Sequence, residues 1–202
     1  LAWYRQQSPE QLVFPGVREA DHDLNVSFEV ETVWMEQTGK VLPGVGHVSW
    51  LPLQSPASPV LVVSDMGRGS VKELTLRGRE RTVRLLARLH HPCHVELCDL
   101  DRDGAMDLVV ADLGSYDAQD HHRGRVIWLR RNADADDYQT IVLAAGLGRV
   151  ADVRPGDFDG DGDLDLLVAV FGMVSTGDIR MFWNVADAGQ WPRFEQQIID
   201  PR

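Results

Sequence analysis

The chain has 202 residues, of which 44% are hydrophobic, so it is long enough to bury a substantial core. Its formal net charge of −11 argues against nucleic acid or an anionic membrane surface as a partner, because both are bound through basic patches. No run of about 18 or more consecutive apolar residues occurs, so the sequence predicts no insertion into a membrane.

The first predicted segment, residues 1–44, is the least regular part of the sequence. Its opening stretch LAWYRQQSPEQLVF (1–14) resembles the later stretch VIWLRRN (126–132), and it predicts the end of a preceding repeat unit. The stretch VSFEVETVWME (26–36) alternates enough to predict one more strand, within a degenerate or connecting segment. Because the sequence starts at Leu1 inside such a unit, we expect it to be a segment of a longer protein.

Three related units follow, at residues 45–90, 91–148 and 149–202. The stretch HVSWLPLQSPASPVLVVSDMG (47–67) aligns with HVELCDLDRDGAMDLVVADLG (94–114), and DLDRDGAMDLVVADLG (99–114) aligns with DFDGDGDLDLLVAVFG (157–172). Each unit then continues with two more short strand patterns, and no stretch shows a convincing helical stripe. Four short strands in a unit that recurs about every 50 residues predict the blades of an all-β propeller.

The second and third units carry an acidic loop between their first two predicted strands. Both loops have the pattern D-x-D-x-D-G-x-x-D, in which carboxylates would repel one another unless a hard cation lay between them. Calcium takes six to eight oxygen ligands, and the seventh loop position usually offers a backbone carbonyl. An EF-hand has a Glu ligand at loop position 12. In the loop that begins at Asp157, position 12 is Val168 and lies in a predicted strand, so the pattern is not an EF-hand. The expected ligands are Asp99, Asp101, Asp103, Ala105, Asp107, Asp157, Asp159, Asp161, Asp163 and Asp165.

The first unit lacks these ligands. Pro52, Gln54, Pro56 and Val60 stand where the second unit has its aspartates, so we expect two calcium sites in the chain and none in residues 45–90. The alternative for the two acidic loops is a solvated surface turn.

Together these patterns resemble the FG-GAP or VCBS repeat family, which is related to the propellers of integrin α-subunits. The resemblance covers about residues 45–200 and is carried by the VADLG and VAVFG strands and by the two acidic loops. It implies a β-propeller, commonly seven-bladed, with calcium in loops on one face. The chain would then contain about three full four-stranded blades plus part of another.

The first predicted strands of the three units share a register. His47, His94 and Asp152 occupy one repeat position, and Ser49, Glu96 and Arg154 occupy another. Because innermost propeller strands surround a central channel, these residues predict a ligand site on the channel face, at His47, His94, Glu96, Asp152 and Arg154. The interpretation that we favour over a ligand site is an ion pair between blades, from Glu96 to Arg154, with half-exposed histidines.

The two cysteines are interpreted as small packing residues. Cys93 aligns with Gly46 and Ala151, a position that requires a small side chain. Cys93 and Cys98 lie five residues apart along one predicted strand, which places their sulfurs too far apart for a disulfide. The loop SYDAQDHHRG (115–124) is long and polar, and it is either functional or simply solvated.

The favoured function is a calcium-binding propeller module of a larger secreted, cell-surface or periplasmic protein, acting as an interaction scaffold. Its expected partners are a protein or carbohydrate ligand, and the remaining blades of the same protein or a second copy. The alternative is part of a propeller-type polysaccharide-active enzyme or a lectin, with its site on the channel face. The sequence leans away from an enzyme, because G-x-S-x-G, H-E-x-x-H and G-x-G-x-x-G motifs are absent.

Overall fold

The computed structural model describes residues 2–7, 27–32, 44–51, 60–77, 80–132, 134, 136–175, 177–187 and 189–201. The chain divides into two compact units, Leu1–Gly39 and Lys40–Arg202. In the compact unit Leu1–Gly39, β1 (Ala2–Gln7) pairs antiparallel with β2 (Ser27–Thr32). Strands are therefore present in both stretches of this segment that the sequence predicted to be extended.

The described residues of the compact unit Lys40–Arg202 form three four-stranded antiparallel sheets, each made of consecutive strands. The first sheet consists of β3 (Val45–Leu51), β4 (Val60–Asp65), β5 (Ser70–Arg77) and β6 (Glu80–Arg88). The second consists of β7 (Pro92–Cys98), β8 (Asp107–Asp112), β9 (Gly124–Asn132) and β10 (Asp137–Leu147). The third consists of β11 (Arg149–Gly156), β12 (Asp165–Phe171), β13 (Asp178–Asn184) and β14 (Phe194–Pro201).

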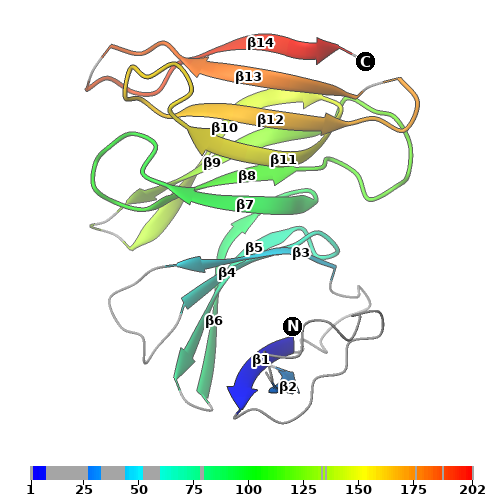
Figure 1. Ribbon diagram of the computed structural model, residues 1–202, viewed down its shortest axis with the longest axis vertical. Helices are drawn as coiled ribbons and strands as arrows, with labels where there is room; N and C mark the ends of the chain where they lie inside the picture. The colour runs from blue at the N-terminus through cyan, green and yellow to red at the C-terminus, as the bar shows by residue number, and fades with distance from the viewer. Residues whose placement is uncertain are drawn as a thin grey trace, which may run out of the picture. The chain divides into compact units, whose positions relative to one another are not determined.

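The three sheets are stacked in chain order like the blades of a propeller (Figure 1). All elements among the described residues are strands, which confirms the all-β class and the four-stranded units. The loop 52–59 of the first repeat (45–90) contains the prolines that stand in place of acidic ligands, and it lies outside the described residues. Closure into a ring and the total number of blades stay predictions.

Two buried apolar layers lie between the sheets, one on each side of the second sheet, and β8 contributes side chains to both. Successive side chains of a strand point to opposite faces. Leu108 and Val110 therefore pack with the first sheet, whereas Val109 and Ala111 pack with the third. All four side chains are fully buried, which explains why this strand reads as a continuous apolar run rather than an alternating one.

Among the first strands of the sheets, β7 contacts both β3 and β11. At Gly46 of β3, an added Cβ would lie 2.6 Å from the backbone oxygen of Cys93 in β7, so a side chain there would push the two strands apart. This close approach is the physical reason for the small residue that the repeat alignment predicts at this position. Among the described residues, no helix is long and apolar enough to cross a membrane.

Candidate functional site

The two acidic loops connect the first and second strands of the second and third sheets. Both lie at the same end of the stacked sheets, on the left in Figure 1. Each loop turns at a glycine with positive φ, +85° at Gly104 and +93° at Gly162. The amide of that glycine donates to the first aspartate of its loop, at 3.0 Å to Asp99 Oδ2 and 3.1 Å to Asp157 Oδ2. The two loops therefore fold alike.

Three carboxylates come together in each loop. One oxygen from each of Asp99, Asp101 and Asp107 lies within 4.8 Å of the others, and the same holds for one oxygen from each of Asp157, Asp159 and Asp165. The remaining expected ligands are outside these groups. Asp103 Oδ1 accepts from Ala105 N at 2.8 Å, and Asp161 Oδ1 accepts from Asp163 N, also at 2.8 Å.

The last aspartate of each loop is fully buried at the start of the second strand. Asp107 accepts hydrogen bonds from the backbone amides of Leu100, at 3.2 Å, and Arg131, at 2.7 Å, and from Trp128 Nε1 at 2.9 Å. Desolvation nevertheless raises the pKa of Asp107 to about 6. Asp165 accepts from two backbone amides, those of Phe158 and Asn184.

Arginine side chains offset part of the negative charge of these loops. Arg130, on β9, contacts Asp101 and Asp103, with 2.7 Å between Arg130 Nη2 and Asp103 Oδ2. Arg102, in the first acidic loop, pairs with Asp163 of the second loop at 2.8 Å and so joins the second sheet to the third. The ring of Trp191 lies 5.0 Å from the Arg130 guanidinium and covers it.

The donor set of the loops fits a calcium ion. All the gathered atoms are carboxylate oxygens, the ligand type that this hard cation takes. Asp99 Oδ1 is buried and has no hydrogen-bond partner among the described residues. A buried carboxylate oxygen without a partner is costly, and a bound cation would remove that cost.

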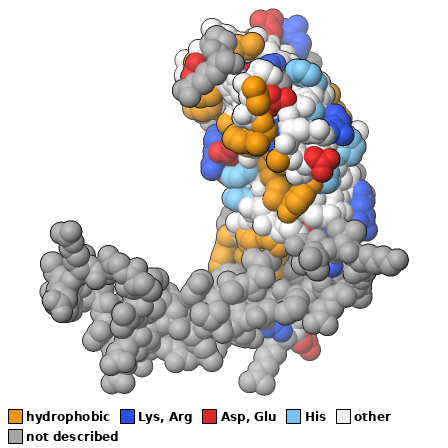
Figure 2. Space-filling model, turned by 90° about the vertical axis from the view of Figure 1, so that its right-hand side faces the viewer, with side chains coloured by type: hydrophobic (Ala, Val, Ile, Leu, Met, Phe, Trp, Pro, Cys, Tyr) orange, Lys and Arg blue, Asp and Glu red, His pale blue; other side chains and the backbone are white. Residues whose placement is uncertain are grey.

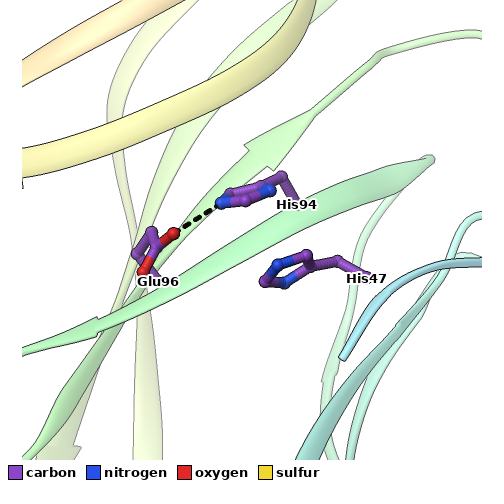
Figure 3. Close-up of side chains that lie close together, drawn as sticks. All are labelled: His47, His94 and Glu96. Atoms are coloured by element: carbon purple, nitrogen blue, oxygen red, sulfur yellow. Dashed lines mark hydrogen bonds and ion pairs between the residues drawn. The ribbon is translucent and has the colours of Figure 1, made fainter. Parts of the chain in front are cut away.

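The predicted inner-strand residues also come together. The rings of His47 and His94 lie 3.9 Å apart between centroids and are tilted by 36°. His94 Nε2 lies 2.8 Å from Glu96 Oε1 and 3.2 Å from Asp152 Oδ1. Arg154 pairs with both carboxylates. Figure 3 shows His94 and Glu96 joined on β7, with His47 facing them from β3.

In the first strand of each sheet, a register shift lies directly before the residue that joins this cluster. The pairing slips between Val45 and His47, between Pro92 and His94, and between Val150 and Asp152. Such bulges change the direction of the side chain that follows them. The recurrence of the bulge explains why one repeat position brings three side chains from three sheets together.

Neighbouring groups orient the His47 ring. Its Nδ1 lies 3.4 Å from Ser49 Oγ, which in turn donates to the backbone oxygen of Val95 at 2.9 Å. Desolvation, with a smaller contribution from His94, lowers the pKa of His47. The imidazole of His47 is therefore favoured in its neutral form.

Residues 99–168 match the family model of an FG-GAP-like repeat. The match begins at the first acidic loop and ends within β12, so it includes both loops and the strands between them. It supports the FG-GAP part of the predicted resemblance and does not address the VCBS part. No curated protein and no solved structure is significantly similar to the chain.

Cys93 and the long loop 115–124 have structural partners. Cys93 Sγ contacts the backbone oxygen of Val150 at 3.2 Å, and both cysteines are free thiols. Burial raises the pKa of each thiol to about 12. In the long loop, Asp120 accepts from the amides of Met173 and Ser175, both at 2.7 Å, and so links two sheets.

The loops on the right in Figure 1 carry exposed apolar side chains, among them Tyr116, Met173 and Val174. Figure 2 shows hydrophobic side chains gathered on this face among acidic and histidine side chains. Sequence reasoning left the alternatives for the 115–124 loop open, and the Asp120 contacts give it a role in positioning its neighbour.

Sequence reasoning missed Arg130 and Trp191 as partners of the first acidic loop. Arg130 is one of two arginines at the end of a predicted strand, and nothing in the strand pattern distinguishes them. Trp191 lies far along the chain, in the connection between β13 and β14 of the next sheet. Their placement depends on how two sheets face each other, which no local signal in the sequence encodes.

Proposed function

We propose that this chain is a calcium-stabilised β-propeller repeat module of a larger secreted or periplasmic protein and that it serves as an interaction scaffold. One observation carries the proposal. Two loops with the same fold each gather three carboxylate oxygens within 4.8 Å, inside a region that matches an FG-GAP-like repeat. Extracellular calcium modules bind their ion with Kd values of about 10⁻⁴–10⁻³ M, which suits a secreted setting.

The chain's residues have distinct roles in this proposal. Asp99, Asp101 and Asp107 would hold one ion, and Asp157, Asp159 and Asp165 would hold the other. A bound calcium ion supplies positive charge and accepts lone pairs from oxygens that otherwise repel one another. Each loop joins the first two strands of its sheet, so an ordered loop keeps those strands paired. The proposed effect of calcium is structural rather than catalytic.

The outer face of the third sheet supports the scaffold role. A groove of about 350 Å³ is lined by Ala169, Val170 and Ile179 together with neighbouring residues. On the same sheet, Phe171 is 51% exposed and Ile179 is 38% exposed. Apolar exposure of this kind marks interaction surfaces. A further blade of the same protein or a second copy is the proposed occupant, because the covered face of the second sheet is apolar at the equivalent positions.

The number of bound ions tests the calcium proposal. Protein stripped with a chelator, reloaded with calcium and freed of excess ion should contain two ions per chain, and isothermal titration calorimetry should give the same stoichiometry. Asp107→Asn and Asp165→Asn should each lose one ion, whereas Asp117→Asn, which removes an exposed carboxylate outside the loops, should lose none. Absence of calcium binding, or binding that is unaffected by both loop variants, would contradict the proposal.

The enzyme or lectin alternative would use the inner-strand cluster of His47, His94, Glu96, Asp152 and Arg154. That cluster is the observation in its favour, since polar side chains from three sheets converge there. A glycan array probed with the calcium-loaded protein tests it. Binding that is lost in Glu96→Gln would support a carbohydrate site, and no binding would leave the scaffold role as the proposal.

A further inference from the structure

Two imidazoles and a carboxylate meet on the inner strands, away from the acidic loops. One ligand atom from each of His47, His94 and Glu96 lies within 4.8 Å of the others. His47 comes from the first sheet, and the other two come from the second. Figure 3 shows His94 and Glu96 joined by a dashed line, with the His47 ring beside the His94 ring.

The chemistry of this cluster differs from that of the calcium loops. Calcium prefers oxygen ligands, whereas imidazole nitrogen suits zinc, copper and nickel. Two histidines with one glutamate are a known ligand set for zinc. Zinc lies about 2.0–2.2 Å from its nitrogen and oxygen ligands, so adjacent ligand atoms in a tetrahedral site are about 3.3–3.6 Å apart.

The charge of the cluster also admits a cation. Glu96 and Asp152 contribute two negative charges, and Arg154 contributes one positive charge through its ion pairs with both. With neutral histidines, the partly buried cluster retains one negative charge. Asp152 Oδ1, 3.2 Å from His94 Nε2, lies beside the site and can hydrogen-bond to a ligand or to a bound water.

Neighbouring groups hold the ring of His47 in place. Ser49 lies against His47 Nδ1 and is itself anchored to the backbone of Val95. Contacts of this kind fix the ring orientation of metal-binding histidines, and the Val95 amide lies 3.4 Å from the same His47 nitrogen. The bulges before His47 and His94 turn both rings toward the same space.

We propose that His47, His94 and Glu96 form a binding site for a divalent transition-metal ion of the zinc or copper type, separate from the two calcium loops. A bound ion would replace the hydrogen bond between His94 and Glu96 and would link β3 of the first sheet to β7 of the second. The site is independent of the proposed calcium function, since it shares no ligand with either loop.

Zinc binding to the untagged protein tests this proposal. Calorimetry in millimolar calcium, which keeps the acidic loops from contributing, should show one zinc ion per chain and a higher melting temperature with zinc. His47→Gln and Glu96→Gln should weaken zinc binding by roughly tenfold or more, since even the loss of an outer partner costs about that much. The control His122→Gln, which changes an exposed histidine of the long loop, should bind zinc like the wild type.

A spectroscopic measurement identifies the ligands directly. Electron paramagnetic resonance of the Cu²⁺-loaded protein should show coupling to two imidazole nitrogens, and the His47→Gln protein should retain one. Melting curves without metal check that both variants fold. Zinc affinity that is equal in the wild type and His47→Gln, or no zinc binding at all, would overturn the proposal and leave the cluster as an ion-pair network only.

Discussion

At the scale of single residues, two glycines show two different reasons for lacking a side chain. Gly104 has a φ of +85°, and no heavy atom lies within 4 Å of the Cβ that could be added to it. Gly46 has no positive φ, yet its added Cβ would meet the backbone of Cys93 at 2.6 Å. The first glycine is required by backbone conformation and the second by the approach of two sheets.

Substitution by alanine should separate these two effects. Gly104→Ala should lower the free energy of unfolding by about 1–2 kcal/mol, the cost of a left-handed conformation. Gly46→Ala should cost more, because β3 and β7 must move apart, and it should also disturb the His47–His94 contact. Chemical denaturation measures both values. A smaller loss for Gly46→Ala than for Gly104→Ala would contradict the packing argument.

Burial controls the reactivity of the two thiols. Desolvation raises the pKa of Cys93 and Cys98 to about 12, so little thiolate is present at pH 8. We expect iodoacetamide to modify the folded protein much more slowly than the denatured protein at this pH. Mass spectrometry over time measures both rates, with free cysteine as the reference. Rapid modification of the folded chain would show that these positions are accessible.

At the scale of elements, the two acidic loops share a backbone fold but differ in their neighbours. The first loop pairs with Arg130 of β9, whereas the equivalent position of β13 is Trp183. Asp101 is only 8% exposed in its pair with Arg130, so part of the loop's charge is already offset within the protein. The loops should therefore differ in their need for calcium.

Arg130→Gln should lower the stability of the calcium-free protein and raise the calcium affinity of the first acidic loop. In chelator, the variant should lose about 1 kcal/mol of stability, because Asp101 and Asp103 lose their counter-charge. In calcium the loss should shrink, and the first loop should bind calcium more tightly than in the wild type. Melting curves in chelator and in calcium, with calorimetry, test both parts. Weaker calcium binding in this variant would show that Arg130 supports the site instead of competing with the ion.

The sequence predicted the strands and the acidic loops because both depend on local patterns. The alternation of apolar residues and the D-x-D-x-D-G spacing need no knowledge of distant segments. It also predicted that His47, His94 and Asp152 lie together, because equivalent positions of stacked repeats lie at the same height. It did not predict the bulges that direct these side chains, nor the contact of Arg130 with Trp191. Both depend on how a strand meets its partner or how one sheet meets the next.

At the scale of the whole molecule, calcium should act on the stability of the fold. An ion that binds only the folded state stabilises it by about 2.7 kcal/mol at a hundredfold excess over Kd. The melting temperature should therefore fall when calcium is replaced by chelator. The shift should be smaller in Asp107→Asn and in Asp165→Asn, and Asp117→Asn should behave like the wild type. An unchanged melting temperature on chelation would contradict a structural role for the ion.

The apolar face of the third sheet should make the isolated chain self-associate. Exposed Phe171 and Ile179, with the groove beside them, present a surface that another sheet could cover. Sedimentation velocity should show reversible association that weakens in Ile179→Lys, whereas Val83→Lys, a change of an exposed residue on the first sheet, should have little effect. A monomer at all concentrations would contradict an interaction role for this face.

Each described four-stranded sheet is formed by one continuous stretch of chain, and its strands follow one another in sequence order. The sheets are joined to one another by side-chain packing and by a few ion pairs, such as Arg102–Asp163, rather than by a shared strand ladder. Under a pulling force applied to the ends of the chain, one sheet can therefore unravel while the next keeps all of its backbone pairing. Force–extension curves should show a series of separate peaks, each releasing the length of one repeat, and calcium should raise the peaks of the two sheets that carry acidic loops.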